Sequence, residues 1–192
     1  MNKASPLLGT LMLTPLVGAS DSLVNALGLA LAFAWVMSLF GLCMVPLRAR
    51  LNPTQRLLAS VLLSASLVSC VLMGLQAWAF ELHQHLALYL GLLALQCVVL
   101  EQTHFFQTPS MLRRAALFCC LLIGLGALRE ALGGGVLGQH LQWLAGINDT
   151  DWPGWRWSQG GPHLLLLAPG GFILLGLLLA AKNAWTQLRN PH

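Results

Sequence analysis

Residues 57–80 read LLASVLLSASLVSCVLMGLQAWAF, a run without one charged side chain that decides the fold class. A helix needs about 20 apolar residues to cross the hydrocarbon core of a bilayer. Hydrophobic and polar residues do not alternate along the run, as they would in a strand of a membrane barrel. The run therefore predicts a transmembrane α-helix.

Similar stretches recur along the chain, in which 57% of the 192 residues are hydrophobic and only 8% are charged. Further long apolar stretches with no Asp, Glu, Lys or Arg include Ser22–Leu47, Leu82–Leu100, Ala115–Leu128 and Trp157–Ala181. A water-soluble domain could not cover such a composition with polar surface. The sequence predicts one all-α integral membrane domain over residues 1–192. It has about six transmembrane segments if Pro6–Gly18 is retained as a half-helix or re-entrant segment.

The basic residues lie at the ends of the apolar segments, so the net charge of +4 does not indicate a nucleic-acid ligand. By the positive-inside rule, the loops around Arg48–Arg56 and Arg113–Arg114 are expected in the cytoplasm. Two helices then connect these loops as a hairpin whose outer turn is predicted at Glu81–Gln84. The Trp-rich loop of about residues 133–163 is expected outside, and both chain termini are expected in the cytoplasm.

Glycine and proline mark the expected ends and breaks of helices. Gly133–Gly135 should end the outward-running helix that precedes the external loop. The last helix should start near His163 and contain Pro169-Gly170-Gly171. This motif, like Pro15 in the first segment, predicts either a broken helix that lines a site or a simple packing kink.

Ionisable side chains near membrane depth are functional candidates by default. Here they are Asp21, Glu81, Glu101, Arg129 and Glu130, all at predicted helix ends. Asp21 has an alternative interpretation as the N-cap of the second helix. Arg129 and Glu130 have an alternative interpretation as side chains that only mark the membrane interface. The sequence also leaves open an ion path through these groups.

The five cysteines form no CxxC pair, no haem-attachment motif and no zinc-site spacing. Cys43, Cys70 and the adjacent Cys119-Cys120 are interpreted as apolar packing residues. Cys97 lies alone in LQCVVL at residues 95–100. It is either packing as well or half of a site that another subunit completes.

The histidines offer a competing prediction, a membrane cytochrome with axial histidines on facing helices. His83 and His85 lie at the predicted outer turn, His104 in an inner loop and His163 at a helix start, so their depths do not match. The sequence has no glycine-rich nucleotide loop, nucleophile elbow or paired catalytic carboxylates. We therefore expect no catalysis by this chain alone.

Five short motifs stand in an order typical of a known family. They are NALGL at 25–29, AWAF at 77–80, QCVV at 96–99, GALRE at 126–130 and APGGFILLGL at 168–177. From about Leu8 to Asn183 the chain resembles the E-subunit family of the Rnf (Rsx) ion-translocating electron-transport complex. That family is related to the D subunit of the sodium-pumping NADH:quinone reductase.

The resemblance implies two inverted three-helix repeats, with the first and fourth segments broken or re-entrant, in a bacterial inner membrane. It implies a homologous, oppositely oriented A-type partner together with the other subunits of the complex. In such a pair, each half of each subunit offers one cysteine to a [2Fe–2S] cluster held between the two proteins.

Cys97 matches the second-half cysteine of this pattern and is the cluster ligand that the resemblance implies. The first-half pattern, LGLCPLL, aligns with LMLTPLV at residues 11–17, so Thr14 stands where the other thiol should be. A threonine hydroxyl is a poor donor to iron. Either the cluster has three cysteines and another ligand, or this chain has lost it.

The resemblance thus implies a membrane subunit of a ferredoxin- or NADH-linked complex that couples transmembrane electron transfer to Na⁺ or H⁺ translocation. Flavin and NAD are not expected on this chain. Two alternatives stay open: a non-redox inverted-repeat transporter or channel, and a scaffold subunit without a cofactor.

Overall fold

The computed structural model describes residues 18, 20–103, 106, 111–138, 155–156 and 167–189. Its helices are α3 (Leu23–Arg48), α4 (Pro53–Trp78), α5 (Phe80–Gln102), α6 (Met111–Arg129), the π-helical turn η2 (Glu130–Gly134) and α7 (Ala168–Arg189). The short strands β1 (Val136–Leu137) and β2 (Trp155–Arg156) pair antiparallel. The predicted first segment, including Thr14 and Pro15, lies outside the described residues, as does most of the Trp-rich loop.

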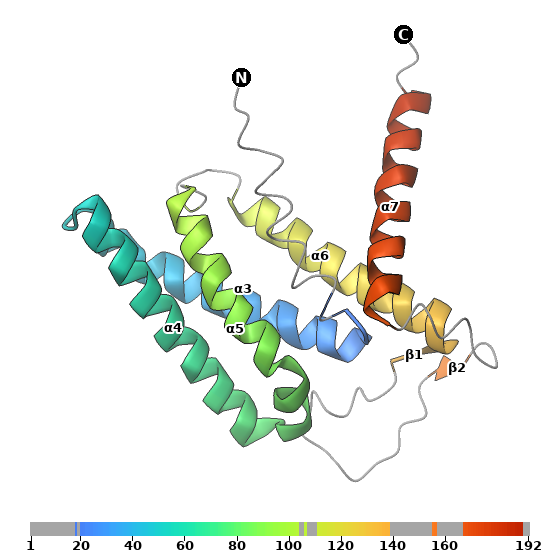
Figure 1. The fold of residues 1–192 in the computed structure, drawn as a ribbon, viewed down its shortest axis with the longest axis horizontal. Helices are drawn as coiled ribbons and strands as arrows, with labels where there is room; N and C mark the ends of the chain where they lie inside the picture. Colours follow the sequence, from blue (N-terminus) through green and yellow to red (C-terminus); the bar gives the residue numbers. More distant parts are fainter. Residues whose placement is uncertain are drawn as a thin grey trace.

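Helix α3 lies at the centre and packs against α4, α5 and α6. Phe33, Val36, Phe40 and Met44 along α3 are each at most 1% exposed. The Phe33 ring packs on Phe118 of α6, with ring centroids 4.7 Å apart. Figure 1 shows α4 and α5 side by side as a hairpin, whereas α7 extends away from the other helices.

Helix α4 buries small residues and exposes large ones. Its buried residues are Ser60, Ser64 and Val68, whereas Leu62 and Met73 are 72% and 71% exposed. Small residues let helices approach closely inside a membrane. An exposed apolar face of this extent suits lipid or a membrane partner and would be unfavourable in water.

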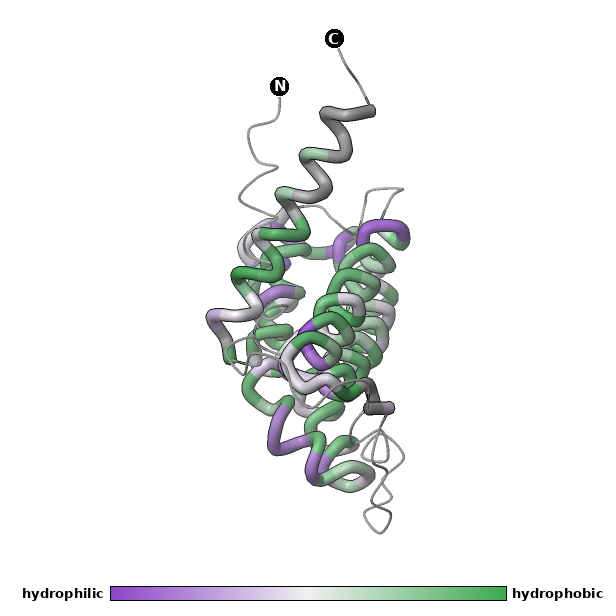
Figure 2. Tube along the Cα trace, turned by 90° about the vertical axis from the view of Figure 1, so that its right-hand side faces the viewer, coloured by the Kyte–Doolittle hydropathy of each residue, from purple (hydrophilic) through white to green (hydrophobic). Residues whose placement is uncertain are grey.

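Four helical stretches of the described residues are long and apolar enough to cross a membrane: α3, α4, α5 and Met111–Gly134. Pro169–Leu178 is a shorter apolar stretch. Figure 2 shows hydrophobic residues along most of the helical length and hydrophilic residues mainly toward helix ends. The predicted helical membrane fold is thus confirmed in its coarse form, and the six segments and the inverted repeat stay predictions.

The α4–α5 hairpin turns earlier than the sequence predicted. Only Ala79, with φ −140° and ψ 78°, separates Trp78 at the end of α4 from Phe80 at the start of α5. The predicted turn, Glu81–Gln84, instead lies within the start of α5. An acidic side chain is favourable there because it faces the positive end of the helix dipole.

One of the expected breaks is corrected by the described residues. Helix α5, the predicted fourth segment, runs unbroken from Phe80 to Gln102, since it contains no proline and Gly91 is its one glycine. Pro169 lies in the first turn of α7, where proline is well tolerated. The expected helical stretch before it, residues 163–166, lies outside the described residues, so the break at Pro169 stays a prediction. The predicted glycine stop is confirmed, because Gly135 adopts φ 63° and ends η2.

Candidate functional site

The buried charged side chains of the described residues lie at the two ends of α3. The α3 amino-terminal cluster comprises Ser20, Asp21, Ser22, Asn25, Arg129 and Glu130, and the α3 carboxy-terminal clamp comprises Arg48, Arg56 and Glu101. The 26 residues of α3 span about 39 Å at 1.5 Å per residue. A hydrocarbon core is about 30 Å thick. The two groups therefore lie near opposite surfaces of a bilayer that α3 crosses.

Carboxylates from two distant parts of the chain meet at the first residues of α3. Ser22 is the N-cap, and its Oγ accepts the Asn25 N–H at 3.2 Å. Asp21 precedes the cap, which corrects its interpretation as the N-cap, and its Oδ1 accepts the Ser22 N–H at 2.9 Å. Glu130 Oε2 accepts the Leu23 N–H at 2.7 Å. Two acidic groups thus bind consecutive backbone amides at the positive end of the α3 dipole.

Arg129 joins three parts of the chain at this cluster. Its Nη1 donates to Ser20 Oγ at 3.0 Å, and its Nη2 donates to the Leu167 carbonyl oxygen at 3.1 Å. Arg129 is 1% exposed and Glu130 is 4% exposed. The two residues are therefore buried inside the protein, and the interpretation as mere interface markers is wrong.

Close packing of α3 on α6 brings Glu130 within reach of Leu23. A Cβ added at Gly126 would lie 2.7 Å from the Ala26 Cβ and 3.2 Å from the Ser22 carbonyl oxygen. Such contacts are too short for a larger side chain, so glycine at this position permits the helix contact. The π-helical turn η2 then begins at Glu130, and π-helical turns occur frequently at functional sites.

One buried oxygen in the amino-terminal cluster has no partner. Asn25 is 5% exposed, and its Nδ2 donates to Asp21 Oδ1 at 3.0 Å. Its Oδ1 makes no hydrogen bond. Exchanging the two amide atoms would not help, because the carboxylate oxygen needs a donor. A buried polar atom without a partner costs about 1–3 kcal/mol.

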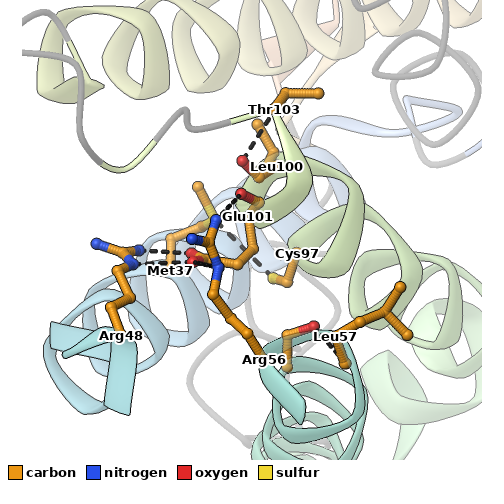
Figure 3. Close-up of polar contacts among 9 residues, drawn as sticks. Met37, Arg48, Arg56, Leu57, Cys97, Leu100, Glu101 and Thr103 are labelled. Atoms are coloured by element: carbon orange, nitrogen blue, oxygen red, sulfur yellow. Dashed lines mark hydrogen bonds and ion pairs between the residues drawn. The ribbon is translucent and has the colours of Figure 1, made fainter. Parts of the chain in front are cut away.

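The carboxy-terminal clamp ties three helices through one carboxylate (Figure 3). Glu101 at the end of α5 is 1% exposed. Arg48 of α3 donates to it with both Nε, at 2.8 Å, and Nη2, at 2.5 Å. Arg56 of α4 approaches the same carboxylate with Nε at 3.1 Å, and its Nη2 donates to the Glu101 carbonyl oxygen at 3.2 Å. A bidentate arginine–carboxylate pair of this kind restricts how the helices are oriented and also adds interaction energy.

Cys97 lies one helical turn before Glu101 and is fully buried (Figure 3). Its Sγ is 3.9 Å from Met37 Sδ on α3. The neighbouring Gln96 is 8% exposed, and neither its Nε2 nor its Oε1 has a partner. Cys43 and Cys119 are partly buried, and Cys70 and Cys120 are exposed. Cys97 therefore differs from the other four cysteines in burial.

A [2Fe–2S] cluster takes four thiolates as a rule. No group of three or more His, Cys, Asp or Glu side chains in the described part of the chain could hold a metal ion. Thr14 lies outside that part. One buried thiol is compatible with a single ligand of a site shared between subunits, but it is insufficient for a whole cluster.

The histidines described in the structure do not form a haem site. His83 and His85 lie in the first turns of α5, and the His83 ring stacks on Phe80 with centroids 6.4 Å apart. Both belong to one helix, whereas the predicted cytochrome needs axial ligands on facing helices. His104 and His163 lie outside the described residues.

The contacts within the two charged groups were not predicted from the sequence. Arg48 and Arg56 were interpreted only as markers of a cytoplasmic loop. Glu101, which closes an apolar stretch on the same predicted side, was the signal that could have linked them. Asn25 was singled out as part of a motif but not as a buried polar group.

Comparison with known proteins identifies similar chains. The family model described as "Rnf-Nqr subunit, membrane protein" matches residues 2–179. A Pseudomonas aeruginosa (strain UCBPP-PA14) protein, named as the E subunit of an ion-translocating oxidoreductase complex, is 37% identical over 180 residues, which cover 89% of this chain and 76% of that protein. Proteins of the same name from Cellvibrio japonicus and Rhodobacter capsulatus are 33% and 30% identical, covering 90% of this chain and 76% and 75% of their own lengths.

Proposed function

This chain belongs to the Rnf-Nqr family of membrane subunits, and on that premise we propose that it is a membrane subunit of an ion-translocating oxidoreductase complex. In this role it takes part in ferredoxin- or NADH-linked electron transport that drives Na⁺ or H⁺ across the membrane. The family match over residues 2–179 carries the proposal. Four apolar helices that expose large side chains outward support it.

The proposed location is the bacterial inner membrane, with both termini in the cytoplasm. The clamp residues Arg48 and Arg56, together with Arg113 and Arg114, would lie on the cytoplasmic side. Trp155 is 75% exposed beside the opposite end of the bundle, as expected of an aromatic residue at an outer interface. Reporter fusions after Arg56 and near Asp151 should report opposite sides of the membrane, and the same side would contradict this orientation.

The proposed partner is a homologous membrane subunit of opposite orientation, accompanied by the other subunits of the complex. An open apolar groove of about 530 Å³ lies between α3 and α4. Trp35 and Trp78 beside the groove are 62% and 75% exposed. Aromatic side chains of this kind are common anchors at protein interfaces.

Cys97 is the proposed contribution of this chain to a [2Fe–2S] cluster shared with that partner. Such a cluster would supply one-electron transfer within the membrane. On this chain, Cys97 would hold iron through its thiolate, and the clamp around Glu101 one turn away would keep α5 in place. The family's other cysteine position is occupied by Thr14, so the partner or another residue must complete the ligand set.

A cofactor-free scaffold is the second candidate function. The packing of Cys97 Sγ at 3.9 Å from Met37 Sδ favours it, because this contact occupies the thiol within the chain's own core. In that case the chain would position its partners without carrying electrons.

Affinity purification of the tagged full chain from native membranes tests the proposal. We expect other subunits of the complex to co-purify, including a homologous membrane subunit. Iron content and the visible spectrum of this preparation then separate the two candidates, since the scaffold role predicts that Cys97→Ser changes neither. A stable monomer with no associated redox subunit would contradict both.

A further inference from the structure

The unpartnered Asn25 oxygen belongs to a cluster rich in other oxygen atoms. Its amide bonds to the Asp21 carboxylate, and that carboxylate and the Glu130 carboxylate accept from the adjacent Ser22 and Leu23 N–H groups. Asn25 Oδ1 is therefore a buried acceptor on a side chain that bonds to Asp21, two residues from the backbone amide that binds Glu130. An acceptor in such surroundings is satisfied by a donor or by a cation.

The charges of the cluster indicate the sign of the missing group. Asp21 and Glu130 contribute two negative charges, and Arg129 contributes one positive charge. The sum is one negative charge near the surface of the predicted membrane region. Ionisable groups at membrane depth are rare and usually mark ion or substrate pathways.

The set of ligands indicates a single charge on that group. A divalent ion in a protein is commonly held by several carboxylate, imidazole or thiolate ligands. The described residues offer no group of three or more such side chains. Amide and carboxylate oxygens are ligands of hard cations in general, and the single net negative charge of the cluster is balanced by one monovalent cation.

We propose that the α3 amino-terminal cluster binds a monovalent cation of the Na⁺ class through Asn25 Oδ1 and the Asp21 carboxylate. Glu130 contributes its negative charge to the site while its Oε2 still accepts the Leu23 N–H. Arg129 fixes the neighbouring chain segments through Ser20 and Leu167. The inference deepens the proposed function, on which it rests for its transport role, by placing an ion near the non-cytoplasmic end of α3.

The test compares the purified complex in NaCl with the same complex in choline chloride at equal ionic strength. The first readout is the melting temperature, which needs no electron transfer. The second is the Na⁺ concentration that half-saturates electron transfer. Wild-type protein should melt at a higher temperature in NaCl than in choline chloride, because an ion that binds only the folded state stabilises it.

Asn25→Ala removes the proposed ligand oxygen, and Ser64→Ala is the matched control. Ser64 is also buried in a helix, at 1% exposure, but its hydroxyl bonds to the Val61 carbonyl oxygen of its own helix. Asn25→Ala should abolish the Na⁺-dependent rise in melting temperature and raise the half-saturating Na⁺ concentration about tenfold, which corresponds to 1.4 kcal/mol. Ser64→Ala should leave both unchanged.

Asn25→Asp keeps an oxygen at the site, loses the Nδ2 donor to Asp21 and adds a negative charge, so its Na⁺-dependent rise in melting temperature should exceed that of the wild type. An unchanged or smaller rise in this variant would overturn the proposal, which keeps the test decisive if Asn25→Ala fails to fold. A wild-type melting temperature that is the same in NaCl and choline chloride would overturn the proposal and leave water as the occupant. Equal Na⁺ responses in Asn25→Ala and Ser64→Ala would overturn it as well. Because the complex-subunit proposal is tested by co-purification and the thermal readout needs no electron transfer, failure of the cation site is distinguishable from failure of the complex-subunit proposal.

Discussion

Glu130 holds the first turn of α3 from 107 positions away in the sequence, with its Oε2 accepting the Leu23 N–H at 2.7 Å. The first N–H groups of a helix have no partner within the helix. A buried carboxylate from η2 supplies one here. The bond fixes the end of α6 on the start of α3.

Replacing Glu130 should therefore destabilise the protein. Glu130→Ala leaves the Leu23 N–H without its acceptor, and we expect a loss of about 1–3 kcal/mol in the free energy of unfolding. The melting temperature of the detergent-solubilised protein measures this loss. Glu81→Ala, in the first turn of α5 but partly exposed, should change stability by less than about 0.5 kcal/mol. Equal effects of the two changes would contradict the role of the Glu130 bond.

The carboxy-terminal clamp predicts a second stability effect. Glu101→Gln removes the charge that Arg48 and Arg56 share, and breaking a buried ion pair costs about 3–5 kcal/mol. The arginine side chains are 15% and 19% exposed, so water can recover part of that loss, and we expect about 2–3 kcal/mol.

The measurement for the clamp is the amount of folded protein in membranes together with its melting temperature. Arg50→Gln, at an exposed position between the two clamp arginines, is the control and should have little effect. Wild-type stability of Glu101→Gln would show that the clamp adds nothing to the fold.

Two glycines of α6 offer a matched pair for the helix contact. Gly126→Ala would place a Cβ 2.7 Å from the Ala26 Cβ, and overpacking of this kind costs about 1–3 kcal/mol. Gly124→Ala would meet nothing within 4 Å and should be neutral or gain up to about 1 kcal/mol in helix propensity. Thermal unfolding of the two variants should differ in this direction, and the reverse order would refute the close α3–α6 packing.

The cysteines separate the cluster proposal from simple packing. If Cys97 is a ligand, Cys97→Ser should remove a [2Fe–2S] signal from the assembled complex and stop electron transfer. Single serine changes at Cys43, Cys70, Cys119 or Cys120 should leave both intact. Thr14→Cys should shift the spectrum or the potential if Thr14 adjoins the iron. Electron paramagnetic resonance and iron analysis provide the readout, and an unchanged signal in Cys97→Ser would rule out Cys97 as a ligand.

Much of the helical architecture is predictable because it depends on local composition. The length of the apolar stretches predicts α3 and α4. The glycine stop was predictable because glycine readily adopts a positive φ, such as the 63° of Gly135, that ends a helix. The turn at Ala79 was missed because polar residues near an interface occur both in turns and in first helical turns. The start of the last helix at Ala168, rather than near His163, could not be read from Pro169, since proline both breaks helices and starts them.

The candidate site was predictable residue by residue but not as a geometry. Asp21, Glu101, Arg129 and Glu130 stood out because charges are costly in apolar segments. Their partners depend on tertiary packing, such as the Gly126–Ala26 contact that brings Glu130 to Leu23. No local pattern in the sequence encodes that contact.

The most direct test of the proposed function is electron-transfer-driven cation uptake by inside-out membrane vesicles from cells with and without this chain. NADH or reduced ferredoxin serves as the donor, and uptake of ²²Na⁺ and acidification of the vesicle interior are followed in parallel. We predict that deletion of the chain abolishes donor-dependent uptake of the coupling ion and that the wild-type chain restores it. Uptake of both ions at the wild-type rate in vesicles without the chain would contradict the proposed role.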